Sequence, residues 1–238
     1  PRPSRQRGDQ LANPFPPAMS GSSDIPGDTP NANPSRPVMQ LLARGLQLWV
    51  RQQCQSIDSL EIRLEGSPLQ LLRGRLAGVR LLARRVVYQQ FHLELVELAS
   101  GPIQVHVGNL LRGQPLQLEQ AFQIQGQVSF TPAGLTRSLG DPRWRSLADS
   151  LGETLLGIVP LGGVRIHHDK LVLTALAQGR PDPIEQETTV SSVGGSVEIR
   201  CVAGSPSYLL PMDPGITIGA ARLEAGMLQL LGDARVSA

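Results

Sequence analysis

The residues of this sequence that could carry chemistry are few and scattered. His167, His168 and Asp169 are adjacent, but neighbouring side chains in a strand point to opposite faces, so the two imidazoles are poorly placed to hold one metal ion. Cys54 and Cys201 belong neither to a CxxC motif nor to a metal-ligand spacing. No GxSxG turn, GxGxxG fingerprint or phosphate-binding loop is present. We therefore expect no metal, no cofactor and no catalytic residues.

One basic cluster suggests binding instead. Five arginines fall within thirteen residues that contain no acidic residue and several leucines and valines: Arg73, Arg75, Arg80, Arg84 and Arg85. Guanidinium groups match phosphate oxygens, and an apolar surface beside them would accept acyl chains. The cluster therefore predicts a phospholipid or similar amphipathic ligand whose headgroup contacts Arg73, Arg75, Arg84 and Arg85. The alternative is a solvated basic face, paired across strands with Glu94 or Glu97.

Composition narrows the classes of function further. Lys170 is the only lysine among 22 basic residues, a bias that follows either from genome composition or from a use for guanidinium groups. Aromatic residues make up only 3% of the chain, which argues against a nucleic-acid binder that stacks bases. We expect no nucleic-acid partner, and the oligomeric state stays open.

The location of the protein is limited by what the sequence lacks. There is no run of about 18 apolar residues, so we expect no membrane-spanning helix. No secretory signal is visible, and the two cysteines fit a reducing compartment. The chain opens on Pro1 rather than methionine, so its native start stays open. We expect a cytoplasmic or peripherally membrane-associated protein.

The N-terminal segment differs in composition from the rest of the chain. Residues 1–37 hold nine of the twenty prolines and few apolar side chains, so we predict a disordered tail followed by a single domain over 38–238. Pro37 suits the first turn of a helix. Apolar residues then recur at helical spacing over 38–54, namely Val38, Leu42, Leu46 and Trp49. Such a stripe packs on a core or anchors a helix to a membrane surface, and we favour the core.

Period-two alternation predicts long strands that bury one face. The clearest case is 116–130, where the apolar residues occupy even positions: Leu116, Leu118, Phe122, Ile124, Val128 and Phe130. A pattern this long implies a curved sheet, or a bulge for which Gly126 is the candidate. Further strands are predicted at 60–66, 75–84, 86–98, 103–107, 164–177, 188–202 and 218–231. The Gly162-Gly163 and Gly194-Gly195 pairs are predicted to be turns.

A helical segment interrupts the strands. Thr131 can cap a helix that Pro132 opens and Gly140 ends. Asp141 and Pro142 open a second helix, whose apolar stripe contains Trp144, Ala148, Leu151 and Leu155 before Gly157 stops it. We therefore predict an α+β fold: a long N-terminal helix and a central helix pair packed on a long, curved antiparallel sheet.

The apolar faces of these elements would line a ligand cavity. The side chains predicted to line it come from three strands and the helix pair: Phe91, Leu93, Leu95, Phe122, Ile124, Phe130, Leu135, Leu139, Trp144, Leu151 and Leu155. A register error of one residue would exchange the two faces of a strand and, with them, this set.

Four segments resemble a known family. Residues 72–79 (LRGRLAGV), 83–88 (ARRVVY), 110–116 (LLRGQPL) and 130–136 (FTPAGLT) are similar to the bacterial LmeA-like phospholipid-binding family, long catalogued as a domain of unknown function, and the resemblance spans roughly 55–235. It implies phospholipid binding, peripheral association with a bacterial membrane, and an elongated sheet around an apolar cavity. Family members with export signals act outside the cytoplasm. The family usually has an acidic residue after the capping threonine, whereas this chain has Pro132-Ala133-Gly134.

Three hypotheses follow. The first is non-catalytic binding of a phospholipid or similar ligand beside a membrane. The second is a structural or scaffold protein with a fully packed core and protein partners. The third is an enzyme of unrecognised type, which would need a polar pocket holding a titratable group with a strongly shifted pKa.

Overall fold

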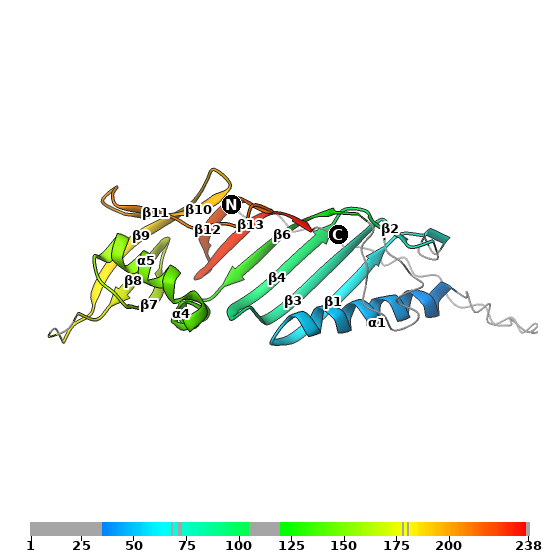
Figure 1. The fold of residues 1–238 in the computed structure, drawn as a ribbon, viewed down its shortest axis with the longest axis horizontal. Coiled ribbons are helices and arrows are strands. Elements are labelled where there is room, and N and C mark those ends of the chain that lie inside the picture. The colour runs from blue at the N-terminus through cyan, green and yellow to red at the C-terminus, as the bar shows by residue number, and fades with distance from the viewer. Residues whose placement is uncertain are drawn as a thin grey trace, which may run out of the picture. The chain divides into compact units, whose positions relative to one another are not determined.

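The described part of the chain has the predicted α+β architecture (Figure 1). The structure, a computed structural model, describes residues 35–67, 69–70, 73–104, 120–177, 179 and 181–236. Three α-helices and thirteen strands lie within these ranges. The helices are α1 (Ser35–Gln53), α4 (Pro132–Gly140) and α5 (Arg145–Leu156), with a short 3-10 helix over Pro142–Trp144 between the last two.

The strands form two large antiparallel sheets, one before and around the helix pair and one that follows it in sequence. A six-stranded sheet has the order β1 (Ser56–Glu65), β3 (Gly78–Tyr88), β4 (Phe91–Ser100), β6 (Phe122–Phe130), β13 (Met227–Val236) and β12 (Ile216–Glu224). A five-stranded sheet has the order β11 (Ser207–Leu209), β10 (Ser196–Cys201), β9 (Ile184–Val193), β8 (Lys170–Ala175) and β7 (Leu161–His167). A small ribbon pairs β2 (Arg75–Leu76) with β5 (Ile103–Gln104).

The six-stranded sheet has two chemically different faces. Directly paired residues share a face, and one row across all six strands contains Leu60, Ala83, Val96, Val128, Leu230 and Ala221. The next row on that face contains Ile62, Leu81, Leu98, Gly126, Gly232 and Ile218. We call this surface the apolar face. The opposite surface, the polar face, includes Glu61, Arg63, Glu97, Gln125 and Asp233.

Gly126 has a packing role rather than the predicted bulge. Strand β6 keeps its register through this residue with both neighbours, and the register shift of the sheet lies in β12, between Ile218 and Ala220. A Cβ at Gly126 would stand 2.4 Å from Leu98 Cδ2 and 2.4 Å from the carbonyl oxygen of Glu97. The missing side chain therefore lets Leu98 lie across the middle of the sheet.

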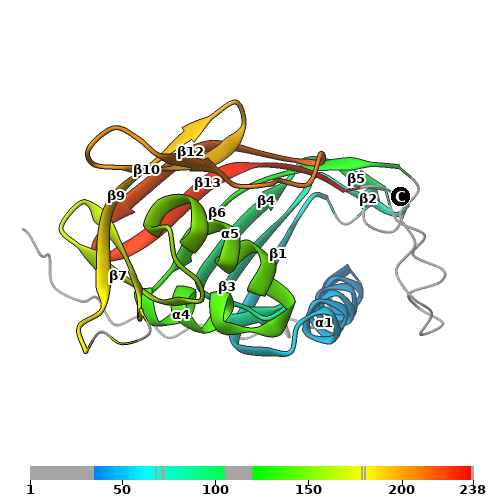
Figure 2. The same ribbon diagram turned by 60° about the vertical axis from the view of Figure 1, so that its left-hand side comes forward.

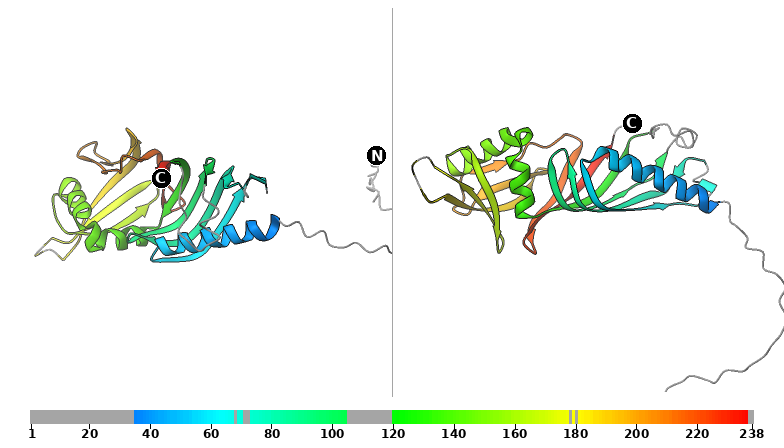
Figure 3. Two further views of the ribbon diagram at one scale, coloured as in Figure 1. Left: turned by 45° about the vertical axis from the view of Figure 1, so that its right-hand side comes forward. Right: turned by 90° about the horizontal axis from the view of Figure 1, so that it is seen from below.

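Helix α1 lies along β1, the first edge of the six-stranded sheet (Figures 1 and 3). The helix begins at Ser35, slightly ahead of the predicted start, and ends at Gln53 as expected. Of the predicted core stripe, Leu42 is buried, Leu46 is half-buried and Trp49 is exposed. The prediction that this stripe packs on the core is therefore confirmed for Leu42 and wrong for Trp49.

The helix pair packs mainly on the five-stranded sheet (Figure 2). The Thr131 hydroxyl accepts a hydrogen bond from the Gly134 backbone N–H at 3.0 Å, which caps α4, and Asp141 caps the 3-10 helix through the N–H of Arg143. Gly157 ends α5 in the left-handed conformation, with φ of 70°. These caps and stops are the predicted ones. Helix α4 also contacts β4 and so joins the two sheets.

Four of the predicted strand segments contain hairpins or hairpin ends. Two-residue turns at Gln89-Gln90, His168-Asp169, Gly194-Gly195 and Ala225-Gly226 separate strands that were expected to be continuous, although the Gly194-Gly195 turn itself was expected. The prediction at Gln89-Gln90 was wrong because neither residue is a turn former, yet both have positive φ, of 48° and 68°.

Some predictions fall wholly or partly outside the described residues. The strand at 103–107 is seen only at 103–104, and the start of the 116–130 strand is not described; β6 begins at Phe122. The family-like segment 110–116 is also outside. The proposed tail over 1–37 and the single domain over 38–238 stay predictions, because the structure describes only residues 35–37 of that tail, as part of α1.

Candidate functional site

The apolar face of the six-stranded sheet is only partly covered. Its first row, nearest the helix pair, is buried at Ala83, Val96 and Ala221. Its second row is half-buried at Ile62, Leu81 and Leu98. A third row is half-buried at Leu64, Val79 and Ile124 and ends at the exposed Ile216. Among the described residues, burial in these rows therefore falls toward the β2–β5 ribbon, and we call that end the open end, although Leu76 and Ile103 of the ribbon itself are buried.

The size of this face suits a long apolar ligand. Five inter-strand spacings of about 4.8 Å give a width of about 24 Å across the six strands. The rows are aliphatic apart from Ser100, whose hydroxyl accepts a hydrogen bond from the Val79 N–H at 2.9 Å. A surface without unpaired polar groups favours hydrocarbon and disfavours water.

A groove of about 720 Å³ is lined mostly by residues of the opposite, polar face of the same sheet, together with Leu81, Leu98, Gly126 and Gly232 of the second apolar row. Its lining includes the carboxylates of Glu61, Glu97 and Asp233, the side chains of Arg63 and Arg80, and apolar positions such as Leu82 and Leu231. Arg80 pairs with Glu65 at 2.5 Å, and Arg63 lies 3.8 Å from Glu61. This groove is chemically mixed, and none of the predicted ligand-binding residues lines it.

The four predicted headgroup arginines lie in two places. Arg73 and Arg75 are exposed beside the open end of the apolar face, where Arg75 belongs to β2. Arg84 and Arg85 are exposed near the other end of β3. Nine positions of mostly extended chain separate Arg75 from Arg84, or roughly 30 Å, so one headgroup cannot contact both pairs.

Arg85 forms an exposed cross-strand ion pair, the kind of contact named in the alternative interpretation, although its partner is not one of the two glutamates expected there. Arg85 Nε donates to Asp58 Oδ2 at 2.5 Å across the β1–β3 pair, rather than to Glu94 or Glu97. This hydrogen bond and the charge of Asp58 raise the pKa of Arg85, and the charge of Glu94 adds a smaller effect. The pair is exposed, so water screens its contribution to stability. Arg85 also adopts a positive φ of 46°.

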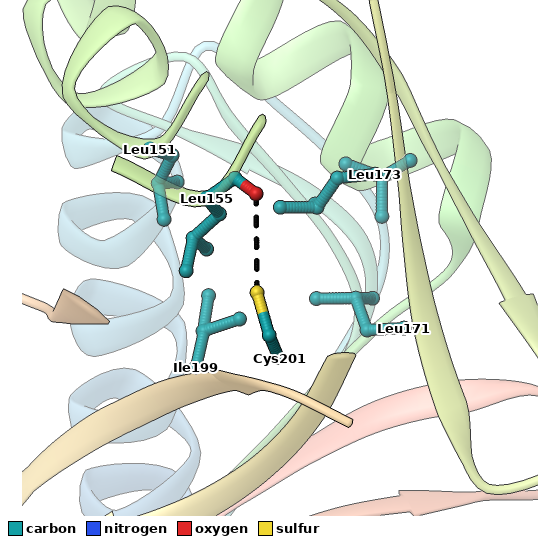
Figure 4. Close-up of a cluster of buried hydrophobic side chains, with 7 residues drawn as sticks. Leu151, Leu155, Leu171, Leu173, Ile199 and Cys201 are labelled. Atoms are coloured by element: carbon teal, nitrogen blue, oxygen red, sulfur yellow. Dashed lines mark hydrogen bonds between the residues drawn. The ribbon is translucent and has the colours of Figure 1, made fainter. Parts of the chain in front are cut away.

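Four of the predicted cavity residues belong to a packed core instead of a cavity wall (Figure 4). Leu151 and Leu155 of α5 are buried against Leu171, Leu173 and Ile199 of the five-stranded sheet. Leu135 and Leu139 of α4 are half-buried against the same cluster. Cys201 completes the cluster, and its thiol donates a weak hydrogen bond to the Leu155 carbonyl oxygen at 3.8 Å.

Three more predicted residues form an aromatic cluster. The Phe91 ring lies 4.0 Å from Trp144 and 6.2 Å from Phe130, centroid to centroid. Trp144 Nε1 donates to the Gln89 carbonyl oxygen at 2.8 Å. The cluster therefore fastens the β3–β4 hairpin to the helix pair.

The remaining predicted residues separate between the two faces. Phe122 and Ile124 lie on the apolar face, half-buried, as the prediction requires. Leu93 packs with Ala83 and Val96, whereas Leu95 is cross-strand from Arg84 and Ser129. Residues of β1, β3 and β13 complete the apolar face but were absent from the predicted set: Leu60, Ile62, Leu64, Val79, Leu81 and Leu230. Their alternation with polar residues was a usable signal.

The histidines and cysteines offer little chemistry. His168 lies in the turn after β7 with φ of 57°, so it is not in the strand geometry that was expected, and its Nδ1 lies 3.2 Å from Nδ1 of His167. In the described ranges, no three His, Cys, Asp or Glu side chains gather as metal ligands would. Burial raises the pKa of the Cys54 and Cys201 thiols, which disfavours the reactive thiolate.

Comparison with known proteins relates both sheets of this chain to one protein family. Among the described residues, no helix is both long enough and apolar enough to cross a bilayer. A family model described as LmeA-like phospholipid-binding matches residues 35–233, which include every described element of both sheets apart from the end of β13. No curated protein and no solved structure matches the chain.

Proposed function

Since the chain belongs to the LmeA-like phospholipid-binding family, we propose that it binds a phospholipid with its acyl chains on the apolar face of the six-stranded sheet. The observation that carries this proposal is the aliphatic surface formed by the second and third rows, which the described residues leave half-buried over β1, β3 and β4, whereas Ile218 at its β12 edge is buried. Covering such a surface with hydrocarbon releases water and is favourable at about 25 cal/mol per Å².

The headgroup position follows from where the face opens. Leu64 and Val79 pair at the open end, and Ala77 N–H donates to the Glu65 carbonyl oxygen immediately beyond them. Arg75 is two residues before Ala77, and Arg73 precedes it in an exposed turn. We therefore assign the phosphate to Arg73 and Arg75, which leaves Arg84 and Arg85 without a role at this site.

The proposal is binding without a reaction, beside a membrane rather than across one. The resolved pKa shifts of charged groups in the described residues arise from ion pairs at the surface: Arg85 with Asp58, Lys170 with Glu187, and the half-buried Glu198 with Arg200. Surface ion pairs of this kind shift pKa values without any catalytic use. Incubation with phospholipid should therefore give no lysophospholipid, fatty acid or phosphate, as lipid mass spectrometry would show.

Two adjacent leucines provide a test of the site. Leu81 shares the apolar face with Ile62 and Leu98, whereas Leu82 shares the polar face with Glu61 and Glu97. Both leucines are half-buried and both border the groove, but only Leu81 packs on the apolar cluster of Ala83 and Val96. We expect L81Q to lower the phospholipid bound per protein roughly tenfold, because a buried amide without a partner costs on the order of 1–3 kcal/mol. L82Q, the matched control, should bind as the wild type does. Native mass spectrometry followed by lipid extraction measures both.

The outcomes are separable. Equal loss in L81Q and L82Q, with unchanged thermal unfolding, would move the ligand away from the apolar face. A clean apo mass for the wild type, with no uptake from mixed liposomes, would contradict lipid binding and favour the scaffold hypothesis. R75E, with R84E as its control, tests the headgroup when a lipid mixture is supplied from detergent, so that docking on vesicles plays no part: we expect R75E alone to lower the share of anionic lipid among the lipids bound.

A further inference from the structure

Helix α1 exposes two adjacent apolar side chains, Leu48 and Trp49, that the described residues leave uncovered. Leu48 is 61% exposed and Trp49 is 38% exposed, although Leu42 of the same helix is buried. Leu48 stands four residues after Arg44 and three before Arg51, so these three side chains share one face of the helix. We call Arg44, Leu48, Trp49 and Arg51 the α1 surface.

The charge of this surface has one sign. The helix contains three arginines and no acidic residue over Ser35–Gln53. Arg44 and Arg51 are exposed, and Arg51 Nη1 also donates to the Ile57 carbonyl oxygen at 3.1 Å, which fixes the last turn of the helix to β1. A helix with exposed leucine and tryptophan between arginines has the composition of an interfacial membrane helix.

The end of the six-stranded sheet next to α1 also exposes an aromatic and a basic side chain. Gln55 N–H donates to the Val87 carbonyl oxygen just after the helix, which brings the last turn of α1 to the end of β3. There Tyr88 is 42% exposed and Arg84 is exposed. The acidic groups of this region are Asp58, which is paired with Arg85, and the half-buried Glu94, so the balance with Arg51 and Arg84 stays basic.

We propose that the α1 surface, with Tyr88 and Arg84 beside it, docks on an anionic phospholipid bilayer. Leu48 and Trp49 enter the boundary between headgroups and acyl chains, while the guanidinium groups of Arg44 and Arg51 stay at the level of the phosphates. The proposal rests on the proposed peripheral function and gives a role to Arg84, which the lipid site does not use. A bilayer is favoured over a protein partner because the surface combines a single sign of charge with isolated apolar anchors, rather than one large apolar patch.

Vesicle binding tests this directly. The full chain is mixed with sucrose-loaded vesicles of phosphatidylcholine alone, or of phosphatidylcholine with phosphatidylglycerol, and sedimented. We expect binding to the anionic vesicles that weakens as NaCl rises, because the attraction is screened. L48E should weaken it at least about tenfold, since it removes an anchor and adds a repelled charge. L209E, at a 54% exposed leucine of the five-stranded sheet, is the control and should bind as the wild type does.

A spectroscopic reading locates the contact. In a W144F background Trp49 is the only tryptophan, because the chain has two. Its emission should shift to the blue on anionic vesicles and be quenched by lipids brominated on their acyl chains. An unshifted spectrum during sedimentation would overturn the assignment to α1, as would equal losses in L48E and L209E. So would a wild-type dimer that L48E dissociates in light scattering, because the surface would then be covered by a second copy.

The phospholipid site on the sheet and the bilayer-docking surface of α1 can be tested separately. Phospholipid supplied from detergent and counted by native mass spectrometry reports on the sheet alone, and L48E should load as the wild type does. If L48E loads normally and still binds vesicles, the α1 proposal is wrong and lipid binding stands. If no variant loads lipid but vesicle binding depends on Leu48, the phospholipid site is wrong and the α1 surface stands.

Discussion

Gly134 shows how one residue can override a helix-capping preference. It occupies the third position of α4, where a capping box has an acidic or amide side chain, and it is buried. A Cβ there would stand 2.7 Å from the His92 carbonyl oxygen of β4. Ser138, one turn later, connects the same helix and strand. Its hydroxyl accepts a hydrogen bond from the His92 backbone N–H at 2.9 Å and donates one to the Gly134 carbonyl oxygen at 2.8 Å. The close approach of helix and strand requires glycine.

An acidic capping residue at position 134 should therefore lower the free energy of unfolding, although such residues usually raise it. Restoring the capping box with G134E should lower the free energy of unfolding, by about 1–3 kcal/mol, because the side chain forces α4 away from β4. A133E places the same charge at the exposed neighbouring position in the first turn, where the helix dipole makes it neutral or stabilising by about 0.3–1 kcal/mol. Urea unfolding measures both, and a more stable G134E would contradict the packing argument.

At the scale of elements, the β3–β4 hairpin carries a turn that its sequence does not suit. Gln89 and Gln90 both adopt positive φ between Tyr88 and Phe91, which pair directly. Non-glycine residues lose on the order of 1 kcal/mol each in this conformation. The aromatic cluster stabilises the turn, because Trp144 donates to the backbone carbonyl of Gln89.

Replacing Gln89-Gln90 with Asn-Gly should stabilise the protein by about 1–2 kcal/mol, since these residues adopt the turn conformation without strain and the bond to Trp144 uses only backbone. The Ala-Ala double substitution is the control: it removes both side chains but keeps the strain, so it should not stabilise. A lower melting temperature for the Asn-Gly variant in calorimetry would show that the glutamine side chains matter.

The sequence predicts an element correctly where neighbouring residues mark its ends or its buried face. Thr131, Asp141 and Gly157 are capping residues with a known mechanism, and the helix pair ends where they stand. Period-two alternation also predicted which residues of β6 lie on the apolar face. The turns at Gln89-Gln90 and His168-Asp169 have no glycine or proline, so the strands on either side were merged. The division into two sheets depends on long-range pairing, which no local pattern encodes.

The sequence predicted an apolar binding surface, but it did not predict most of the residues that form the candidate site. Leu151 and Leu155 were assigned to a cavity because their stripe is apolar, yet an apolar stripe packs equally well on a second sheet. Ile62, Leu81 and Leu98 were passed over, although their alternation is as regular as that of β6. Whether an apolar residue faces a ligand or a core depends on what covers it, and that is a property of the assembled domain.

At the scale of the whole molecule, Trp144 provides one of the contacts between the six-stranded sheet and the helix pair. Trp144 is half-buried between them, stacked on Phe91, whereas Trp49 is exposed on α1. W144A should therefore cost about 3 kcal/mol of unfolding free energy and speed amide exchange in α4 and α5. W49A should cost less than about 1 kcal/mol. Equal costs for the two would show that the aromatic cluster does not link the layers.

The strand order of the larger sheet also sets an order of events during folding. Phe130 of β6 pairs with Leu228 of β13, and the helix pair and the whole five-stranded sheet lie between them in sequence. Until β13 leaves the ribosome, β6 has no neighbour on that side, and its hydrogen-bonding groups are an open template for other chains. Joining such distant partners is slow, because loop closure precedes any gain from pairing. A nascent chain with this topology is therefore most exposed to aggregation just before β13 is made.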